Sequence, residues 1–285
     1  MKAPDIERVI SRVEDLPTLP RTVLRITELV NDPKSSARDL ARIITDDQVL
    51  AARLLKLVNS SFYGFPQRIS TITGAIVLLG FDAIRNLLLT TSVFDLFSNR
   101  RKISLIQQEQ FWDHSLGCAV AAKVIGNYLR YDKIEELFVA GLLHDIGKIV
   151  EMIFLSEAFK DINHLVHAKN ILMITAEETI LGYGHPQVGK MLAERWNLPP
   201  KLVSVILHHH QPSEAGRFAF EAAIVHLADI LSRALNIGYA GDNKMPALDT
   251  SAWESLRIKP QAIQALLADT HKEFDDISLF ITYTL

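Results

Sequence analysis

Residues 137–149, with the sequence LFVAGLLHDIGKI, decide the fold that we predict for this chain. Their first half is almost wholly apolar, which predicts a helix buried at the centre of the protein. The helix then presents His144 and Asp145 side by side, and a buried carboxylate without a partner is energetically costly. The partner is either a divalent metal, since His and Asp are common ligands of zinc, iron and manganese, or Lys148 one turn later, with His144 capping a helix end.

The composition favours a cytoplasmic protein. The chain has 285 residues, of which 48% are hydrophobic, enough for one large or two modest cores. A net charge of -3 gives no electrostatic case for nucleic acid or an acidic membrane as a partner. The single cysteine, Cys118, cannot form an internal disulfide and fits a reducing compartment. The N-terminus lacks the apolar core of a signal peptide, and charged residues interrupt the most apolar stretch, 69–97, so we expect no membrane span.

Helical periodicity with capping signals continues along the chain, and the alternation typical of strands is nowhere sustained. Ser36 and Asp39, for example, have the spacing of a capping box that opens a helix. We therefore predict an all-α protein. A short basic segment at 98–104 (SNRRKIS) separates apolar helices, and it predicts a boundary between a helical subdomain at residues 1–103 and a second at residues 104–285.

All ten histidines follow residue 110, and several accompany aspartates on separate predicted helices. Helical proteins build metal sites by delivering imidazoles and carboxylates from several helices into one interior. Each residue also has a purely structural explanation: His185 as a helix N-cap, the triplet at 208–210 as helix C-terminal residues favoured by the dipole, and Asp229 as a surface carboxylate. We favour the metal site, because so many coincidences in one half of a chain are improbable.

The pattern of His114, His144, Asp145 and Asp229 resembles the H…HD…D signature of the HD superfamily of metal-dependent phosphohydrolases. Other segments are similar to the HDOD family, an HD-related output domain of bacterial signalling proteins; they include LPTLPRTVLRITELVNDP, ITDDQVLAARLLKLVNSSFYG and EETILGYGHPQVGKMLAERWNLPPKLVSVILHHHQP. This resemblance extends over about residues 16–212. It implies an N-terminal helical bundle packed on an HD-domain-like helical bundle, with a C-terminal helical extension and a role in signal transduction.

Similarity to the HD-GYP branch, which hydrolyses cyclic di-GMP, implies which residues bind metal. The implied ligands are His114, His144, Asp145, His185, His209, His210 and Asp229, with Lys148 as a phosphate contact. Two departures limit the analogy. Gln110 stands where a trinuclear site requires a carboxylate, which favours two metals over three. The sequence SEAGRFAF follows HHHQP without a GYP motif, which argues against cyclic di-GMP as substrate.

In the arrangement that we expect, His114, His144 and Asp229 hold one metal, and Asp145 bridges to a second. The second metal is held by His185 and His209, with His210 nearby or ligating. Iron is favoured, with manganese and zinc as alternatives.

Two functions are compatible with this pattern. The first is a signalling module that binds signalling proteins or a small phosphorylated ligand. The second is a metal-dependent phosphohydrolase acting on a nucleotide or cyclic dinucleotide phosphoester.

Overall fold

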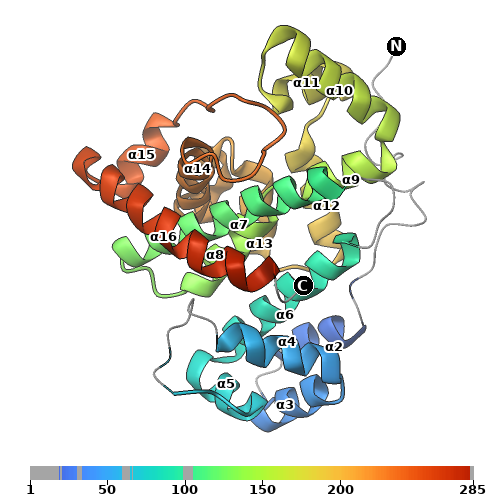
Figure 1. Ribbon diagram of the computed structural model, residues 1–285, viewed down its shortest axis with the longest axis vertical. Helices are drawn as coiled ribbons and strands as arrows, with labels where there is room; N and C mark the ends of the chain where they lie inside the picture. Colours follow the sequence, from blue (N-terminus) through green and yellow to red (C-terminus); the bar gives the residue numbers. More distant parts are fainter. Residues whose placement is uncertain are drawn as a thin grey trace. The chain divides into compact units, whose positions relative to one another are not determined.

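The computed structural model describes residues 19, 21–30, 34–59, 65, 67–98 and 105–282. Within these ranges every regular element is a helix (Figure 1), which confirms the predicted all-α class. The helices fall into two compact units, one formed mainly by residues 18–99 and the other mainly by residues 100–270. The boundary predicted at residues 103–104 lies outside the described residues.

The unit of residues 18–99 is a small helical bundle. It contains α2 (Arg21–Val30), α3 (Ala37–Thr45), α4 (Gln48–Val58), α5 (Ile72–Leu79) and α6 (Phe81–Ser98). Ile26, Leu40, Ile44 and Ile84 are fully buried in its core. The predicted capping box is present, since the Ser36 hydroxyl accepts from the Asp39 amide and the Asp39 carboxylate accepts from the Ser36 amide. It fixes the start of α3.

The larger unit is also helical. Its elements are α7 (Leu105–Tyr128), α8 (Ile134–Leu143), α9 (Ile146–Phe154), α10 (Ser156–Lys169), α11 (Met173–Leu181), α12 (His185–Arg195), α13 (Pro200–His208), the 3-10 segments η1 (Pro212–Phe218) and η2 (Pro260–Ala262), α14 (Ala219–Ala234), α15 (Thr250–Leu256) and the first part, to Thr270, of α16 (Ile263–Thr282). Helix α7 packs along both α8 and α14. Residues 118–122 of α7 (CAVAA) are fully buried, and their small side chains let both neighbours approach closely.

The segment at 137–149 is buried throughout, as predicted, but it is not one continuous helix. Helix α8 ends at Leu143, and α9 begins at Ile146. The break occurs at Asp145, whose φ of -98° and ψ of 11° lie outside the helical region. His144 and Asp145 therefore occupy a turn inside the core rather than one face of a helix.

Among the described residues, no single helix has the length and hydropathy of a membrane span. The pair Ile72–Leu79 and Phe81–Leu89 reaches those values only jointly, and the two parts are bent by 114°.

Candidate metal centre

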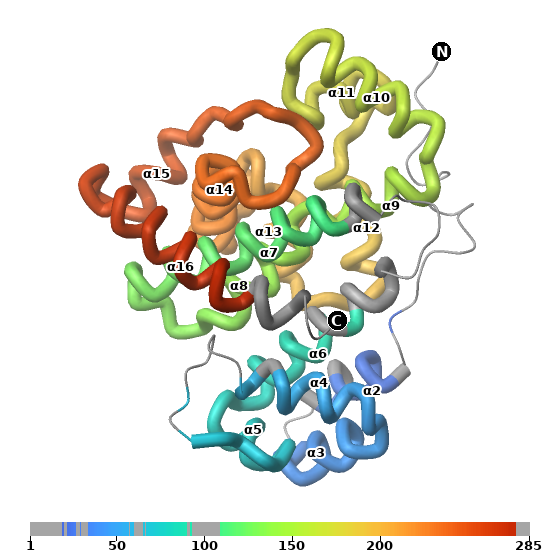
Figure 2. Tube along the Cα trace, viewed as in Figure 1, coloured from blue at the N-terminus to red at the C-terminus, as the bar shows by residue number. Residues whose placement is uncertain are grey.

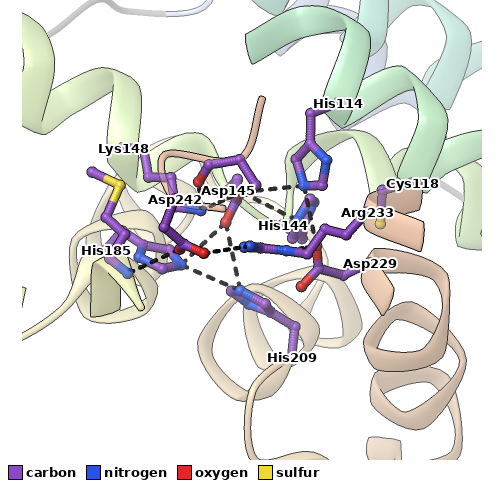
Figure 3. A network of polar contacts seen from close by, with 12 residues as sticks. His114, Cys118, His144, Asp145, Lys148, His185, His209, Asp229, Arg233 and Asp242 are labelled. Atoms are coloured by element: carbon purple, nitrogen blue, oxygen red, sulfur yellow. Dashed lines mark hydrogen bonds and ion pairs between the residues drawn. The ribbon is translucent and has the colours of Figure 1, made fainter. Parts of the chain in front are cut away.

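Five helical segments of the larger unit bring the seven predicted ligands together. They contribute His114 from α7, His144 and Asp145 from the turn after α8, His185 from the start of α12, His209 and His210 from the end of α13, and Asp229 from α14. Figure 3 shows most of these side chains pointing inward toward Asp145. Residues far apart in the sequence thus share one interior site.

The ligands form two groups that can each hold one metal ion. The first ligand group is His114, His144 and Asp229, and the second ligand group is His185, His209 and His210. Within each group the ligand atoms lie within 4.8 Å of one another. Three protein ligands of this kind are sufficient for a zinc or iron ion that keeps an open position.

Asp145 faces both groups through different oxygen atoms. Its Oδ2 lies 3.3 Å from His144 Nε2 and 3.7 Å from His114 Nε2. Its Oδ1 lies 3.1 Å from His185 Nε2 and 3.6 Å from His209 Nε2. A carboxylate with one oxygen on each side has the geometry to bridge two metals, the role that the resemblance implied for it.

Close packing at Gly147 lets His185 reach Asp145. A Cβ atom on Gly147 would overlap the carbonyl oxygen of His185, so α9 and the start of α12 touch through their backbones. Pro186 occupies the first turn of α12, where its missing N–H is no loss. The sequence HP after Gly184 therefore starts a helix whose first side chain enters the site.

Backbone carbonyls orient two of the imidazoles. His144 Nδ1 lies 2.6 Å from the oxygen of Gly141, and His209 Nδ1 lies 2.8 Å from the oxygen of Ile206. A carbonyl oxygen can only accept, so each Nδ1 carries the hydrogen, and each Nε2 lone pair points into the site. This tautomer is the one that binds metal through Nε2.

The interior around the centre is rich in negative charge. Five buried carboxyl groups cluster there, those of Asp145, Glu151, Glu177, Asp229 and Asp242. Two nearby side chains, Lys148 and Arg233, supply permanent positive charge. Buried carboxylates in such excess need further cations or protons, and two divalent ions satisfy that need.

The pKa values in the centre follow from burial and charge. Burial opposes ionisation of Asp145, but His144 and Lys148 outweigh it and hold the pKa of this carboxyl well below its usual range. Burial lowers the pKa of His144, yet the interactions with Asp145 and Cys118 together outweigh burial and raise it well above the usual value. Burial lowers the pKa of His209 to about 4, so this imidazole is neutral and free to ligate.

A loop after α14, residues 238–244 (orange in Figure 2), lies against the site, where Ala240 accepts a hydrogen bond from the buried Lys148. The Tyr239 amide donates to Gln110 O at 2.9 Å, which ties the loop to α7. Asp242 accepts from the Met173 amide at 2.9 Å and from Arg233 Nη1 at 3.0 Å. Arg233 in turn donates to Asp229 Oδ1 at 2.9 Å, so the loop is linked through one cation to a predicted ligand.

Lys148, expected as a phosphate contact, is 1% exposed. Its Nζ donates to Asp145 Oδ2 at 2.6 Å and to Ala240 O at 2.8 Å, so it joins the 238–244 loop to the bridging carboxylate. The pairing with Asp145 was the alternative role considered for this lysine. Lys148 also lines a cavity of about 400 Å³ whose other walls include Phe111, Phe159 and Tyr239.

The sequence analysis did not identify three residues of the site: Glu177, Arg233 and Asp242. Glu177 and Asp242 lie on polar segments, and their partners His185 and Arg233 lie on other elements; Arg233 lies on α14, four residues after its partner Asp229, a spacing that the sequence does show. His226 is buried as well, and its Nδ1 donates to the oxygen of His209 at 2.8 Å, which supports the turn that carries two ligands.

Comparison with known proteins agrees with the motifs. The profile of the HDOD domain matches residues 16–212. The crystal structure of an HDOD domain protein of unknown function from Geobacter sulfurreducens is 30% identical, with a TM-score of 0.73 over 97% of this chain and 92% of that chain. A structure from Shewanella amazonensis SB2B, provisionally named a metal-dependent phosphohydrolase, is 21% identical with a TM-score of 0.67 over 95% of both chains, a likeness of fold alone. An uncharacterized protein of Treponema pallidum is 27% identical over 206 residues, 71% of this chain but 39% of that relative's length.

The fold and the site together define an all-helical domain of the HD-like type, in which histidines and aspartates from several helices converge in the interior. The chain belongs to the HDOD domain family, as the resemblance of its motifs predicted.

Proposed function

We propose that this protein is a bacterial signal-transduction protein that holds two divalent transition metals and acts by binding. One metal is held by the first ligand group and the other by His185 and His209 of the second, with His210 as a further ligand and Asp145 as the bridge. Iron is the favoured metal, since mixed imidazole and carboxylate ligands suit it; manganese and zinc are the alternatives.

The observation that carries the proposal is the enclosure of six of the seven ligands, since only His210 among them is partly exposed. His114 and His209 are 0% exposed, and His144, Asp145 and His185 are 1% exposed. The 238–244 loop lies against the site, and Lys148 is already engaged with Asp145 and Ala240. Catalysis on a large phosphodiester needs an open metal position and groups that orient the substrate, and this enclosure supports binding over hydrolysis.

Two kinds of partner fit a binding role. One is another signalling protein, and the other is a small phosphorylated ligand. The cavity beside Lys148 has the volume for a small ligand, and aromatic rings on its walls suit a planar group. A ligand in this cavity would contact the 238–244 loop. Because Lys148 joins this loop to Asp145, ligand binding would affect the metal centre through the loop.

The alternative is a phosphohydrolase that acts on a nucleotide or a cyclic dinucleotide phosphoester. Its support is the pairing of two ligand groups across one carboxylate, since two adjacent metals lower the pKa of a shared water and clamp phosphoryl oxygens.

One experiment separates the two functions. The protein is purified without chelators, loaded with iron or manganese under reducing conditions, and analysed for metal content. Hydrolysis of cyclic dinucleotides, mononucleotides and a generic phosphodiester is then followed. We expect two metals per chain and turnover below roughly 1 per second, the lower end of the ordinary enzyme range. Faster turnover that disappears in His144→Ala would establish the phosphohydrolase instead.

A further inference from the structure

His185 is oriented differently from the other ligating histidines. His144 and His209 donate from Nδ1 to carbonyl oxygens three residues earlier, but His185 Nδ1 lies 2.7 Å from Oε2 of Glu177. The backbone amide of His185 donates to the same oxygen, also at 2.7 Å. Both side chains are almost completely buried. One carboxylate oxygen on α11 therefore fixes both the backbone and the ring of the first residue of α12.

These two hydrogen bonds determine where the free nitrogen of His185 points. With the hydrogen held at Nδ1, the lone pair on Nε2 faces the second ligand group. Nε2 lies 3.1 Å from Asp145 Oδ1, 3.2 Å from His210 Nε2 and 3.4 Å from His209 Nε2. A carboxylate on the far side of an imidazole also makes the ligating nitrogen more basic.

We propose that Glu177 is a positioning residue that selects the second metal position, because its charge holds His185 as a strong ligand there. In the first position, among the described residues, Nδ1 of His144 faces the carbonyl of Gly141 and Nδ1 of His114 faces Ser232 instead of a carboxylate. The proposal rests on the proposed two-metal centre. In the first position Asp229 is instead paired with Arg233, which withdraws electron density from that ligand. The two positions are thus unequal, and the loss of the Glu177 charge weakens only one of them.

Glu151 offers a matched control. It is a second buried carboxyl group beside Glu177, and burial together with Glu177 raises its pKa well above the usual value. A neutral Glu151 leaves the negative charge on Glu177. Glu151→Gln replaces one neutral group by another of the same shape, whereas Glu177→Gln removes the charge next to His185 but keeps an oxygen that can accept.

The test is a titration of the metal-free 285-residue chain with manganese(II) by calorimetry, combined with elemental analysis after desalting. Wild type should bind two ions, and Glu151→Gln should behave like wild type. Glu177→Gln should keep one ion at wild-type affinity and bind the other about 10- to 100-fold more weakly, the usual effect of removing an outer carboxylate. His144→Ala should weaken the opposite position, which identifies the ion that Glu177 supports.

The outcomes distinguish a wrong two-metal centre from a wrong role for Glu177. If wild type binds no metal, the two-metal centre is wrong. If wild type binds two ions and Glu177→Gln binds both within threefold of the wild-type affinities, the centre stands and the role of Glu177 is wrong. Equal losses in Glu151→Gln and Glu177→Gln would also overturn the role, because they would assign the effect to packing in the carboxyl cluster rather than to the charge on His185.

Discussion

Lys148 and Asp145 form an ion pair in the interior, with Nζ 2.6 Å from Oδ2 and side chains that are 2% and 1% exposed. The same ammonium group donates to the carbonyl of Ala240 in the 238–244 loop. The pair therefore neutralises part of the charge of the proposed bridging ligand and fastens the loop to the site. Its contribution can be measured separately from metal binding.

Lys148→Met should lower the free energy of unfolding of the chelator-treated protein by about 3 kcal/mol, because it leaves a buried carboxylate without its cation. Urea denaturation measures the change. Lys160→Met is the control, since Lys160 also pairs with an acid three residues earlier, Glu157, but on the exposed surface. The control should leave the denaturation midpoint unchanged, and equal losses in both variants would contradict the interior role of Lys148.

Gly238→Ala should both destabilise the protein and weaken manganese binding. Gly238 has a φ of +60°, and a Cβ atom there would overlap the backbone of α7 at Gln110 and His114. The substitution would push the 238–244 loop away from a ligand-bearing turn of α7. Gly216→Ala is the control, because Gly216 has a φ of +58° but open space around it. We expect a lower melting temperature in both variants from backbone strain, and a loss of metal affinity in Gly238→Ala alone.

Metal should stabilise the folded protein. An ion that binds only the native state at about 100 times its Kd adds about 2.7 kcal/mol, which is about 5 °C in melting temperature for a chain of this size. Differential scanning calorimetry with and without a chelator measures the shift. The double variant His144→Ala with Asp145→Ala removes a ligand and the bridge, so its melting temperature should not respond to metal. A full response in that variant would place the metal elsewhere.

A polar cluster away from the metal centre predicts a specific pH dependence. Lys201 donates to Glu136 Oε2 at 2.7 Å and to the Tyr131 hydroxyl at 2.9 Å, and it lies 3.1 Å from Glu221. Burial alone would raise the pKa of Glu136, but the hydrogen bonds and charges of Lys201 and Lys133 together outweigh burial and lower it. A carboxyl whose pKa is lowered in the folded state stabilises the protein above its unfolded pKa of about 4.3, and this contribution disappears as the pH falls through the folded value.

Lys201→Met should therefore cost about 1 kcal/mol near pH 6 and much less below pH 4, by the scale of partly exposed pairs. Urea denaturation of both proteins from pH 3 to pH 7 gives the difference. Lys190→Met, which removes an exposed pair with Glu194, should show no such pH-dependent difference. A loss in Lys201→Met that does not change with pH would mean that packing, and not the charge on Glu136, is responsible.

The helical class and the buried central segment could be predicted because both depend on local patterns. An apolar run such as 137–143 has no stable place except the core, and Ser36 with Asp39 is a local capping signal. The candidate ligands could also be found, since histidine and aspartate within apolar helices are costly unless they have partners. The structure brings all seven together, and their binding of metal stays a prediction.

Other features depend on contacts that a linear pattern does not contain. The break at Asp145 occurs without glycine or proline at that residue, so nothing local distinguishes it from a continuing helix. Glu177 lies in the sequence AEET, which resembles the solvent face of a helix, and its importance appears only when α12 brings His185 beside it. Asp242 lies in a polar loop and acquires its role from Arg233 and from the start of α11.

The spread of the ligands along the chain has a consequence for biosynthesis. They run from residue 114 in α7 to residue 229 in α14, so the site requires contacts between distant parts of the sequence. Such contacts form late, because their loop-closure entropy must be overcome before they stabilise the chain. A nascent chain on the ribosome therefore carries His144 and Asp145 on a hydrophobic segment until α14 has been translated, so metal binding at the proposed two-metal centre would follow translation.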